Sequence, residues 1–172
     1  TYADLSGRLN HDYIVLEVDE ATLPILTIQI KADLIAVTNF FRDQLDRFGE
    51  LDSMAKLIEK GINSNSNTTV ILNADDVRVA YLKTNNKKIY YGLEDKEINN
   101  SSYPLNNKWA LDPEEVTICP NCLSDLIFTN KFLSHLGNYK CSMCNLKRPM
   151  VNFLACNIKR DSLSTNFDVI SN

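Results

Sequence analysis

The sequence predicts an α/β protein, with a mostly parallel sheet and flanking helices, that carries an inserted four-cysteine zinc ribbon. Three observations lead to this prediction. Short apolar runs recur along the first ninety residues, and each run ends in polar or acidic side chains. Segments with helical periodicity lie between the runs, and this alternation is typical of α/β proteins. Two CxxC pairs follow further along the chain, where four thiols suit one tetrahedral metal ion.

The predicted strands cover residues 13–16, 34–37, 69–72 and 89–91, and a further strand is expected in 151–158. Continuous apolar runs suit the strands of a parallel sheet that is covered on both faces. Ligands of open α/β sheets bind outside the carboxyl ends of the strands. We therefore expect a site among the polar residues that follow the runs: Glu17, Asp19, Glu20, Thr38, Asn39, Asn73, Asp75 and Asp76.

Helices are predicted between these strands. Residues 50–62 place apolar side chains on one face, and Gly61 is expected to stop the helix. A shorter helix is expected in 75–84, beginning at an acidic cap. Residues 22–31 fit a strand or a helix, and we predict a helix because a parallel sheet needs a crossover there. Residues 94–115, rich in Asn, Ser and acids, are expected to form a loose connection.

The composition is that of a folded, soluble domain. The 172 residues are 44% hydrophobic and 23% charged, and no apolar run approaches the roughly 18 residues of a membrane span. We expect no secretion signal, because no basic and then apolar leader is visible. The net charge of -4 argues against a nucleic-acid surface over the whole chain, although residues 117–150 are mildly basic.

The metal site is predicted from Cys119, Cys122, Cys141 and Cys144, with eighteen residues between the two pairs. Each CxxC turn places two thiolates on one side of an ion, so the four complete a closed structural Zn²⁺ site. Redox chemistry is the main alternative, but it uses one CxxC pair at the start of a helix. Cys156 is left over. Because four cysteines suffice, His135 is expected to be a surface or packing residue.

A small apolar core is expected around the ion, and metal binding would supply much of its folding free energy, about 10–16 kcal/mol in zinc peptides. Asn145, after the second pair, is expected to adopt the left-handed conformation, whereas Leu123 stands at the corresponding position after the first pair. The core residues expected between the pairs are Leu126, Ile127, Phe128, Phe132, Leu136 and Tyr139.

Four segments carry a resemblance to a known family: "VLEVDEA" at 15–21, "TNFFRDQLDRFGELD" at 38–52, "LNADD" at 72–76 and "HLGNYKCSMCNLKRP" at 135–149. Together they resemble the Mur ligase family, and within it the Mur-ligase-like subunit of lipid II isoglutaminyl synthase. The resemblance implies the central, P-loop-like domain of that family. The GxxxxGK[ST] loop is absent from this chain and expected upstream, so we expect an incomplete domain that alone hydrolyses no ATP.

The activity that the resemblance implies is ATP-dependent amidation of the D-glutamate α-carboxylate of lipid II to D-isoglutamine, in peptidoglycan synthesis. ATP would phosphorylate the carboxylate, and ammonia from a GatD-type glutaminase subunit would attack the acyl phosphate. The implied cofactors are ATP and Mg²⁺, beside structural Zn²⁺. The implied location is the cytoplasm, at the inner face of the cell membrane. Neither nucleic acid nor an integral membrane segment is expected.

The resemblance also implies roles for particular residues. Glu17 matches a glutamate that holds Mg²⁺ near the ATP phosphates, and its alternative is a solvated acid at a strand end. Asn73, Asp75 and Asp76 match an element near the adenosine, while either aspartate suits a helix cap. Asn39 belongs to a loop at the phosphate-facing edge. No catalytic residue is assigned, and the loop residues expected to organise the site are Arg42, Asp43, Gln44 and Asp46.

These expectations divide the chain into a central ATP-binding domain at 1–116, a zinc-ribbon insertion at 117–150, and a continuation of the domain at 151–172. The ribbon is expected to stabilise a protruding element that a partner or substrate contacts. Two alternatives remain. One is a ribbon module that binds protein or nucleic acid, with bases stacked on Phe128, Phe132 and Tyr139. The other is a different Mur-type amino-acid ligase.

Overall fold

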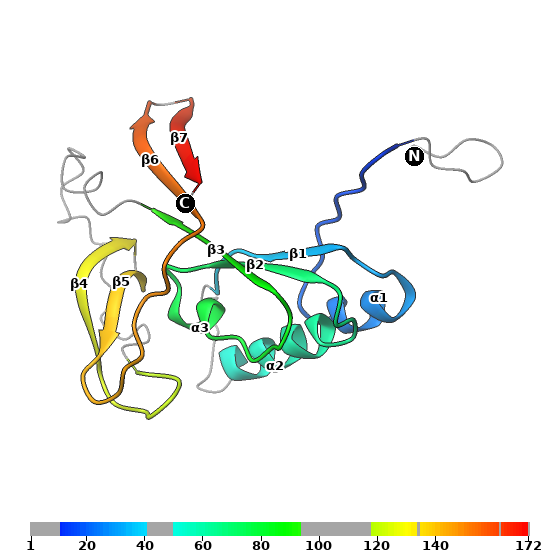
Figure 1. Cartoon of the computed structure of the whole chain (residues 1–172), viewed down its shortest axis with the longest axis horizontal. Coiled ribbons are helices and arrows are strands. Elements are labelled where there is room, and N and C mark those ends of the chain that lie inside the picture. Colours follow the sequence, from blue (N-terminus) through cyan, green and yellow to red (C-terminus); the bar gives the residue numbers. More distant parts are fainter. Residues whose placement is uncertain (1–10, 41–49, 94–117, 134, 162, 172) are drawn as a thin grey trace.

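The computed structural model describes residues 11–40, 50–93, 118–133, 135–161 and 163–171. Within these ranges the helices and strands alternate up to β3, and only strands follow (Figure 1). None of the described helices is long and apolar enough to cross a membrane. The elements are α1 (Leu23–Gln29), β1 (Leu34–Val37), α2 (Glu50–Ile62), β2 (Thr69–Asn73), α3 (Val77–Ala80), β3 (Lys88–Leu93), β4 (Leu126–Leu133), β5 (Leu136–Cys141), β6 (Phe153–Arg160) and β7 (Thr165–Ser171).

In the described part of the chain, the main sheet has five strands in the order β1-β2-β3-β6-β7. The pairs β1–β2, β2–β3 and β3–β6 are parallel, and only β7 runs antiparallel to its neighbour. The predicted mostly parallel sheet is therefore confirmed. Val37 lies opposite Leu72, so the carboxyl ends of β1 and β2 reach the same edge. β4 and β5 form a separate antiparallel pair.

The helices cover one side of this sheet. Figure 1 shows α1, α2 and α3 on the same side of β1–β3. Along β1 the side chains of Ile35 and Val37 are buried, while Leu34 and Ala36 are exposed. The expectation that both faces are covered is therefore not met within the described residues. The buried cluster under the sheet contains Ile35, Val37, Phe40, Ile58, Ile62, Val70, Leu72, Val79 and Leu82.

The uncertain segment at 22–31 is helical, as predicted. α1 begins with Pro24 in its first turn, where proline costs no hydrogen bond. The helix predicted at 50–62 is also confirmed as α2, but Gly61 does not stop it, since Ile62 continues the helix. Gly61 instead permits close packing of the two helices, because a Cβ atom there would lie 2.7 Å from Cγ of Leu23.

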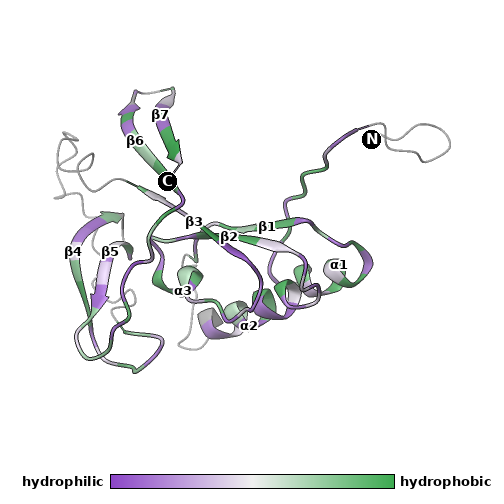
Figure 2. Ribbon diagram, in the orientation of Figure 1, coloured by the Kyte–Doolittle hydropathy of each residue, from purple (hydrophilic) through white to green (hydrophobic). Residues whose placement is uncertain are grey.

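The prediction of a buried strand at 13–16 is wrong. These residues form an extended stretch whose side chains face solvent, with Tyr13 89% and Val15 94% exposed. Figure 2 colours much of this stretch as hydrophobic, and no described strand pairs with it. An apolar run becomes a buried strand only where a neighbouring strand takes up its backbone hydrogen bonds. The sequence pattern shows that the run is apolar, but it does not show whether a neighbouring strand is available to pair with it.

Candidate functional site

Four cysteine sulfurs converge at one end of the β4–β5 hairpin. Their Sγ atoms all lie within 4.8 Å of one another. The distance is 3.7 Å between Cys119 and Cys144 and 3.4 Å between Cys122 and Cys141. In a tetrahedron with Zn–S bonds of about 2.3 Å, the sulfurs are roughly 3.8 Å apart. The donor set and its spacing therefore fit one zinc ion, held by four thiolates.

Each CxxC turn directs backbone N–H groups at a sulfur. Asn121 donates to Sγ of Cys119 at 3.4 Å, and Met143 and Cys144 both donate to Sγ of Cys141 at 3.3 Å. Hydrogen bonds of this kind favour the thiolate over the thiol. Isolated β-bridges between residues 118 and 125 and between residues 140 and 147 close the two turns. The two turns therefore stabilise their cysteine sulfurs as thiolates, the form that binds a metal ion.

The left-handed residue follows the first pair and not the second. Leu123 has φ 63° and donates its N–H to the carbonyl of Cys119 at 3.0 Å. The other described non-glycine residue with positive φ is Asn157, so the expectation for Asn145 is wrong. Asparagine tolerates this conformation well, but here the local turn imposes it on a leucine.

The pKa values of the cysteines depend on these surroundings. Hydrogen bonds from Ser124 lower the pKa of Cys122 to about 6, and the backbone N–H of Leu146 lowers the pKa of Cys144. Burial raises the pKa of Cys119 to about 11. Binding of a metal ion requires the thiolate at every position. Metal binding therefore releases protons, with Cys119 as a clear source.

The ribbon, residues 118–150, packs directly on α3. Val77, the first residue of α3, is fully buried in the apolar cluster of the ribbon, together with Leu126 and Tyr139. Ile127, expected in this cluster, is instead 47% exposed. The hydroxyl of Tyr81, just after α3, donates to the carbonyl of Lys147 at 2.7 Å. The core of the ribbon is therefore shared with the α/β part.

The strand-end site comprises Asn39, Asn73, Asp75 and Asp76, at the carboxyl ends of β1 and β2. Nδ2 of Asn73 donates to Oδ1 of Asn39 at 3.2 Å, and Oδ1 of Asn73 accepts from the backbone N–H of Asp75 at 2.9 Å. The two amides that were predicted from separate motifs are therefore in contact. Parallel register explains this contact, because both strands end at one edge.

Asp76 joins three parts of the chain. Its Oδ1 accepts from the backbone N–H of Arg78 at 2.9 Å and of Val79 at 3.2 Å, so the expected helix cap is confirmed. Its Oδ2 accepts from the backbone N–H of Phe40 at 2.9 Å and lies 3.2 Å from Nε2 of His135. The carboxylate is fully buried, and each of its oxygens has protein partners.

Asp75 is held by the ribbon as well. Its Oδ1 accepts from Nε of Arg148 at 2.7 Å and from Nη2 at 2.6 Å, and its Oδ2 accepts from the backbone N–H of Leu93 at 2.9 Å. Its carbonyl accepts from the N–H of Gly137 at 2.9 Å. Both aspartates thus direct their carboxylates into the protein, and their role beside an adenosine stays a prediction.

Sequence reasoning missed His135 and Arg148. His135 is 4% exposed, as expected for a packing residue. Its imidazole also contacts Asp76, an acid far away in the sequence, and this contact was not expected. A signal was available, since buried carboxylates need donors and the ribbon motif offers a histidine and an arginine. The motif alone does not predict which acids these two residues contact.

Within the described part of the chain, the remaining candidates join neither the metal cluster nor the strand-end site. Glu17 is exposed on the extended stretch before α1, so its proposed contact with a metal stays a prediction. Cys156 is buried in β6 and does not belong to the metal cluster. The loop residues Arg42, Asp43, Gln44 and Asp46 lie outside the described part of the chain.

The ribbon aromatics are engaged within the protein. Tyr139 is 1% exposed, and Phe128 packs against the same cluster with Nζ of Lys131 5.1 Å from its ring centroid. The guanidinium carbon of Arg148 lies 5.9 Å from the ring centroid of Phe132. Base stacking needs exposed ring faces. The geometry therefore gives little support to the nucleic-acid alternative.

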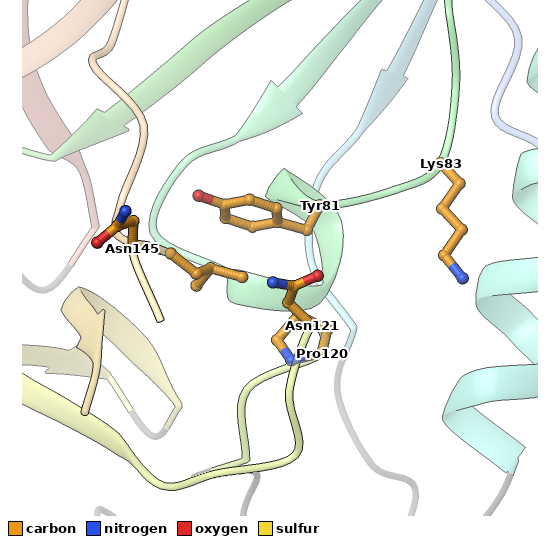
Figure 3. A pocket seen from close by; sticks show the side chains of 6 residues that line it. Tyr81, Lys83, Pro120, Asn121 and Asn145 are labelled. Carbon is orange, nitrogen blue, oxygen red and sulfur yellow. The ribbon is translucent and has the colours of Figure 1, made fainter. Parts of the chain in front are cut away.

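A cavity of about 480 Å³ lies between the end of α3 and the two cysteine turns. Figure 3 shows the ring of Tyr81 over this space, with Asn121 and Asn145 around it and the amine of Lys83 directed away. None of the residues predicted for the strand-end site lines it. Its lining residues are Tyr81, Lys83, Pro120, Asn121, Asn145 and Leu146.

Comparisons with known proteins agree with the resemblance. No family model matches the chain. The lipid II isoglutaminyl synthase (glutamine-hydrolyzing) subunit MurT of Staphylococcus aureus (strain COL) is 34% identical over 140 residues, which cover 81% of this chain and 30% of that subunit. The subunit of the same name from Streptococcus pneumoniae (strain R6) is 32% identical over 148 residues, covering 86% of this chain and 32% of the relative.

A solved structure, that of a pseudomurein peptide ligase type C from Methanothermus fervidus, superposes with a TM-score of 0.58. It is 22% identical in sequence and covers 91% of this chain and 35% of its own. The fold is therefore Mur-ligase-like. Over most of its length, the chain is a homologue of the MurT subunits, and it spans 30–32% of their length. The family predicted from the four motifs is confirmed.

Proposed function

We propose that this chain forms the central part of a ligase subunit in peptidoglycan synthesis, which amidates the D-glutamate α-carboxylate of lipid II to D-isoglutamine. One observation carries the proposal: the chain is 34% identical to a subunit named for glutamine-hydrolysing lipid II isoglutaminyl synthesis. Ammonia comes from a GatD-type glutaminase subunit, and the work takes place in the cytoplasm, at the inner face of the membrane.

The residues of the strand-end site support a binding role. ATP with Mg²⁺, when bound, supplies the activation of the carboxylate that ammonia then attacks. Asn39 and Asn73 present joined carboxamides at the ends of parallel strands, the usual place for a ligand in such sheets. Asp75 and Asp76 hold the backbone around these amides. Glu17 offers the hard oxygen that Mg²⁺ prefers.

The ribbon enters this proposal as a structural element that holds one Zn²⁺. We propose the division of the chain into residues 1–116, 117–150 and 151–172. The register of the sheet supports this division, because Tyr91 of β3 pairs with Phe153 of β6 directly after the ribbon. The sheet thus resumes where the ribbon ends.

A segment exchange tests the proposal. The matching segment of the S. aureus relative is replaced by this chain, the chimera is produced with its glutaminase, and amidation of lipid II with glutamine and ATP is followed by mass spectrometry. The same exchange with the segment of the S. pneumoniae relative is the control. Amidation by both chimeras supports the proposal. The proposal is contradicted if the control chimera amidates lipid II while the chimera with this chain folds and binds zinc but does not amidate.

The role of Glu17 is tested in the same chimera. Glu17→Gln removes the anionic oxygen, and we expect amidation to fall by about tenfold or more, since even partners of metal ligands matter by at least this factor. Asp12→Asn, an exposed acid on the same stretch five residues away, is the control and leaves the rate near that of the parent. Equal rates for both variants would remove Glu17 from the site.

A further inference from the structure

We propose that His135 and Arg148 are positioning residues of the strand-end site. From the ribbon, they hold the two acids that follow β2, and His135 acts through Asp76 to fix the backbone at Phe40, beside Asn39. This inference goes beyond the proposed function and does not depend on which ligand the site takes. It makes the ribbon a part of the site's construction.

The contact between His135 and Asp76 is the first step. Nε2 of His135 and the N–H of Phe40 both lie within hydrogen-bond distance of Oδ2 of Asp76, while α3 takes up Oδ1. His135 is 4% exposed and Asp76 is fully buried, so water does not replace a lost partner. A buried carboxylate that loses a donor is strongly destabilised or moves.

Phe40 transmits this contact to the site. Its side chain is 4% exposed within the cluster beneath the sheet, and its N–H is bound by Asp76. Asn39 precedes it and accepts the hydrogen bond from Asn73. A shift of Asp76 therefore releases the backbone N–H next to the amide that pairs the two strand ends. The path thus runs from Asp76 to Phe40 by a hydrogen bond, to Asn39 along the chain, and to Asn73 by a second hydrogen bond.

Arg148 acts on the second acid. It donates from Nε and Nη2 to Oδ1 of Asp75, and from Nη2 to the carbonyl of Leu93 at 2.9 Å, so it ties the end of β2 to the end of β3. The N–H of Asp75 donates in turn to Asn73. A guanidinium makes these contacts from one planar group, which a lysine ammonium does not reproduce.

The test measures hydrogen exchange of single amides in the zinc-loaded chain. His135→Met and His135→Gln have nearly the same size, but only glutamine offers a donor where Nε2 lies. We expect exchange at the Phe40 amide to rise about tenfold or more with methionine, the scale of a lost hydrogen bond to a charged group, and to stay within about threefold with glutamine. His11→Met, at an exposed position, is the control.

A second amide distinguishes a local effect at Phe40 from a general loss of stability. The amide of Val70 is buried in β2 and donates to the carbonyl of Lys87, so it reports opening of the sheet, and its exchange must change less than that of Phe40. Equal acceleration at both amides, or an unchanged Phe40 amide in zinc-loaded His135→Met, overturns the proposal. Faster exchange at the Phe40 amide with methionine, together with near-parent exchange with glutamine, supports it.

Arg148→Lys provides a second route if the methionine variant does not fold. This change keeps the positive charge but removes the planar guanidinium that donates from two nitrogens. We expect the Asp75 amide to exchange about tenfold faster, while the zinc content stays at one per chain. Lys140→Ala, at an exposed position on β5, is the control. An Asp75 amide that exchanges as in the parent, with zinc bound, overturns the role of Arg148.

Discussion

Gly92 on β3 leaves room for the ion pair of the strand-end site. A Cβ atom there would lie 2.5 Å from Nη2 of Arg148 and 2.7 Å from Oδ1 of Asp75. We predict that Gly92→Ala forces these groups apart and lowers the free energy of unfolding by about 1–3 kcal/mol. Urea unfolding measures the effect, and a midpoint equal to that of the parent would show that the pair adapts without loss.

Tyr91 makes the stability of the folded chain depend on pH in the alkaline range. Burial, with Asp75 and Asp76 nearby, raises the pKa of Tyr91 to about 12. The unfolded chain loses this proton near pH 10, so the folded state binds more protons between about pH 10 and 12, and stability falls as the pH rises. We predict that Tyr91→Phe weakens this fall. Urea midpoints at pH 8 and pH 11 measure it, and identical pH dependence in both proteins would contradict it.

The placement of residues could be predicted from the sequence where their spacing or their position at a strand end defines it. The four cysteines, Asn39 with Asn73, and the cap at Asp76 follow from local patterns and from the rule for strand ends. The partners of the acids could not be predicted in this way. His135 and Arg148 lie about sixty to seventy positions from the aspartates, and only the docking of the ribbon on α3 brings them together.

At the scale of elements, the helices α1 and α2 and the strands β1, β2, β3 and β6 follow from periodicity and topology. The stretch at 13–16 shows the limit of that reasoning. Apolar content predicts that a segment can be buried, but burial of a strand also needs a neighbour that takes up its backbone hydrogen bonds. Among the described strands, none pairs with this stretch.

The ribbon offers a test at this scale. Cys141 lies at the end of β5 and contributes both a sulfur to the cluster and a side chain to the apolar core. We predict that Cys141→Ser lowers zinc content well below one per chain and exposes Tyr139, because three thiolates hold zinc less tightly than four. Zinc analysis and tyrosine fluorescence measure the two effects.

Cys156→Ser is the matched control for this change. Cys156 is also buried, but it lies in β6 and outside the metal cluster. We expect this variant to keep its zinc. Full zinc content in Cys141→Ser would show that the ribbon binds metal through another set of ligands.

At the scale of the whole molecule, the ribbon and the sheet are expected to unfold together. Val77, the ion pair at Asp75 and the contact at Asp76 join the two parts. We predict that a zinc chelator lowers the melting temperature of the entire chain in one transition. Calorimetry measures this, and a separate, unshifted transition of the α/β part would show that the ribbon is an independent unit.

The pairing of Tyr91 with Phe153 also sets the length of chain that must close during folding. β6 can find β3 only after the intervening stretch of about sixty residues folds back on itself. A zinc crosslink between the two cysteine turns shortens this loop, but closure entropy varies so slowly with length that the gain is about 0.5 kcal/mol. Loop length alone thus changes the rate of closure about twofold. A larger acceleration of folding by zinc would come from the docked contacts of His135 and Arg148, formed before β6 reaches the sheet.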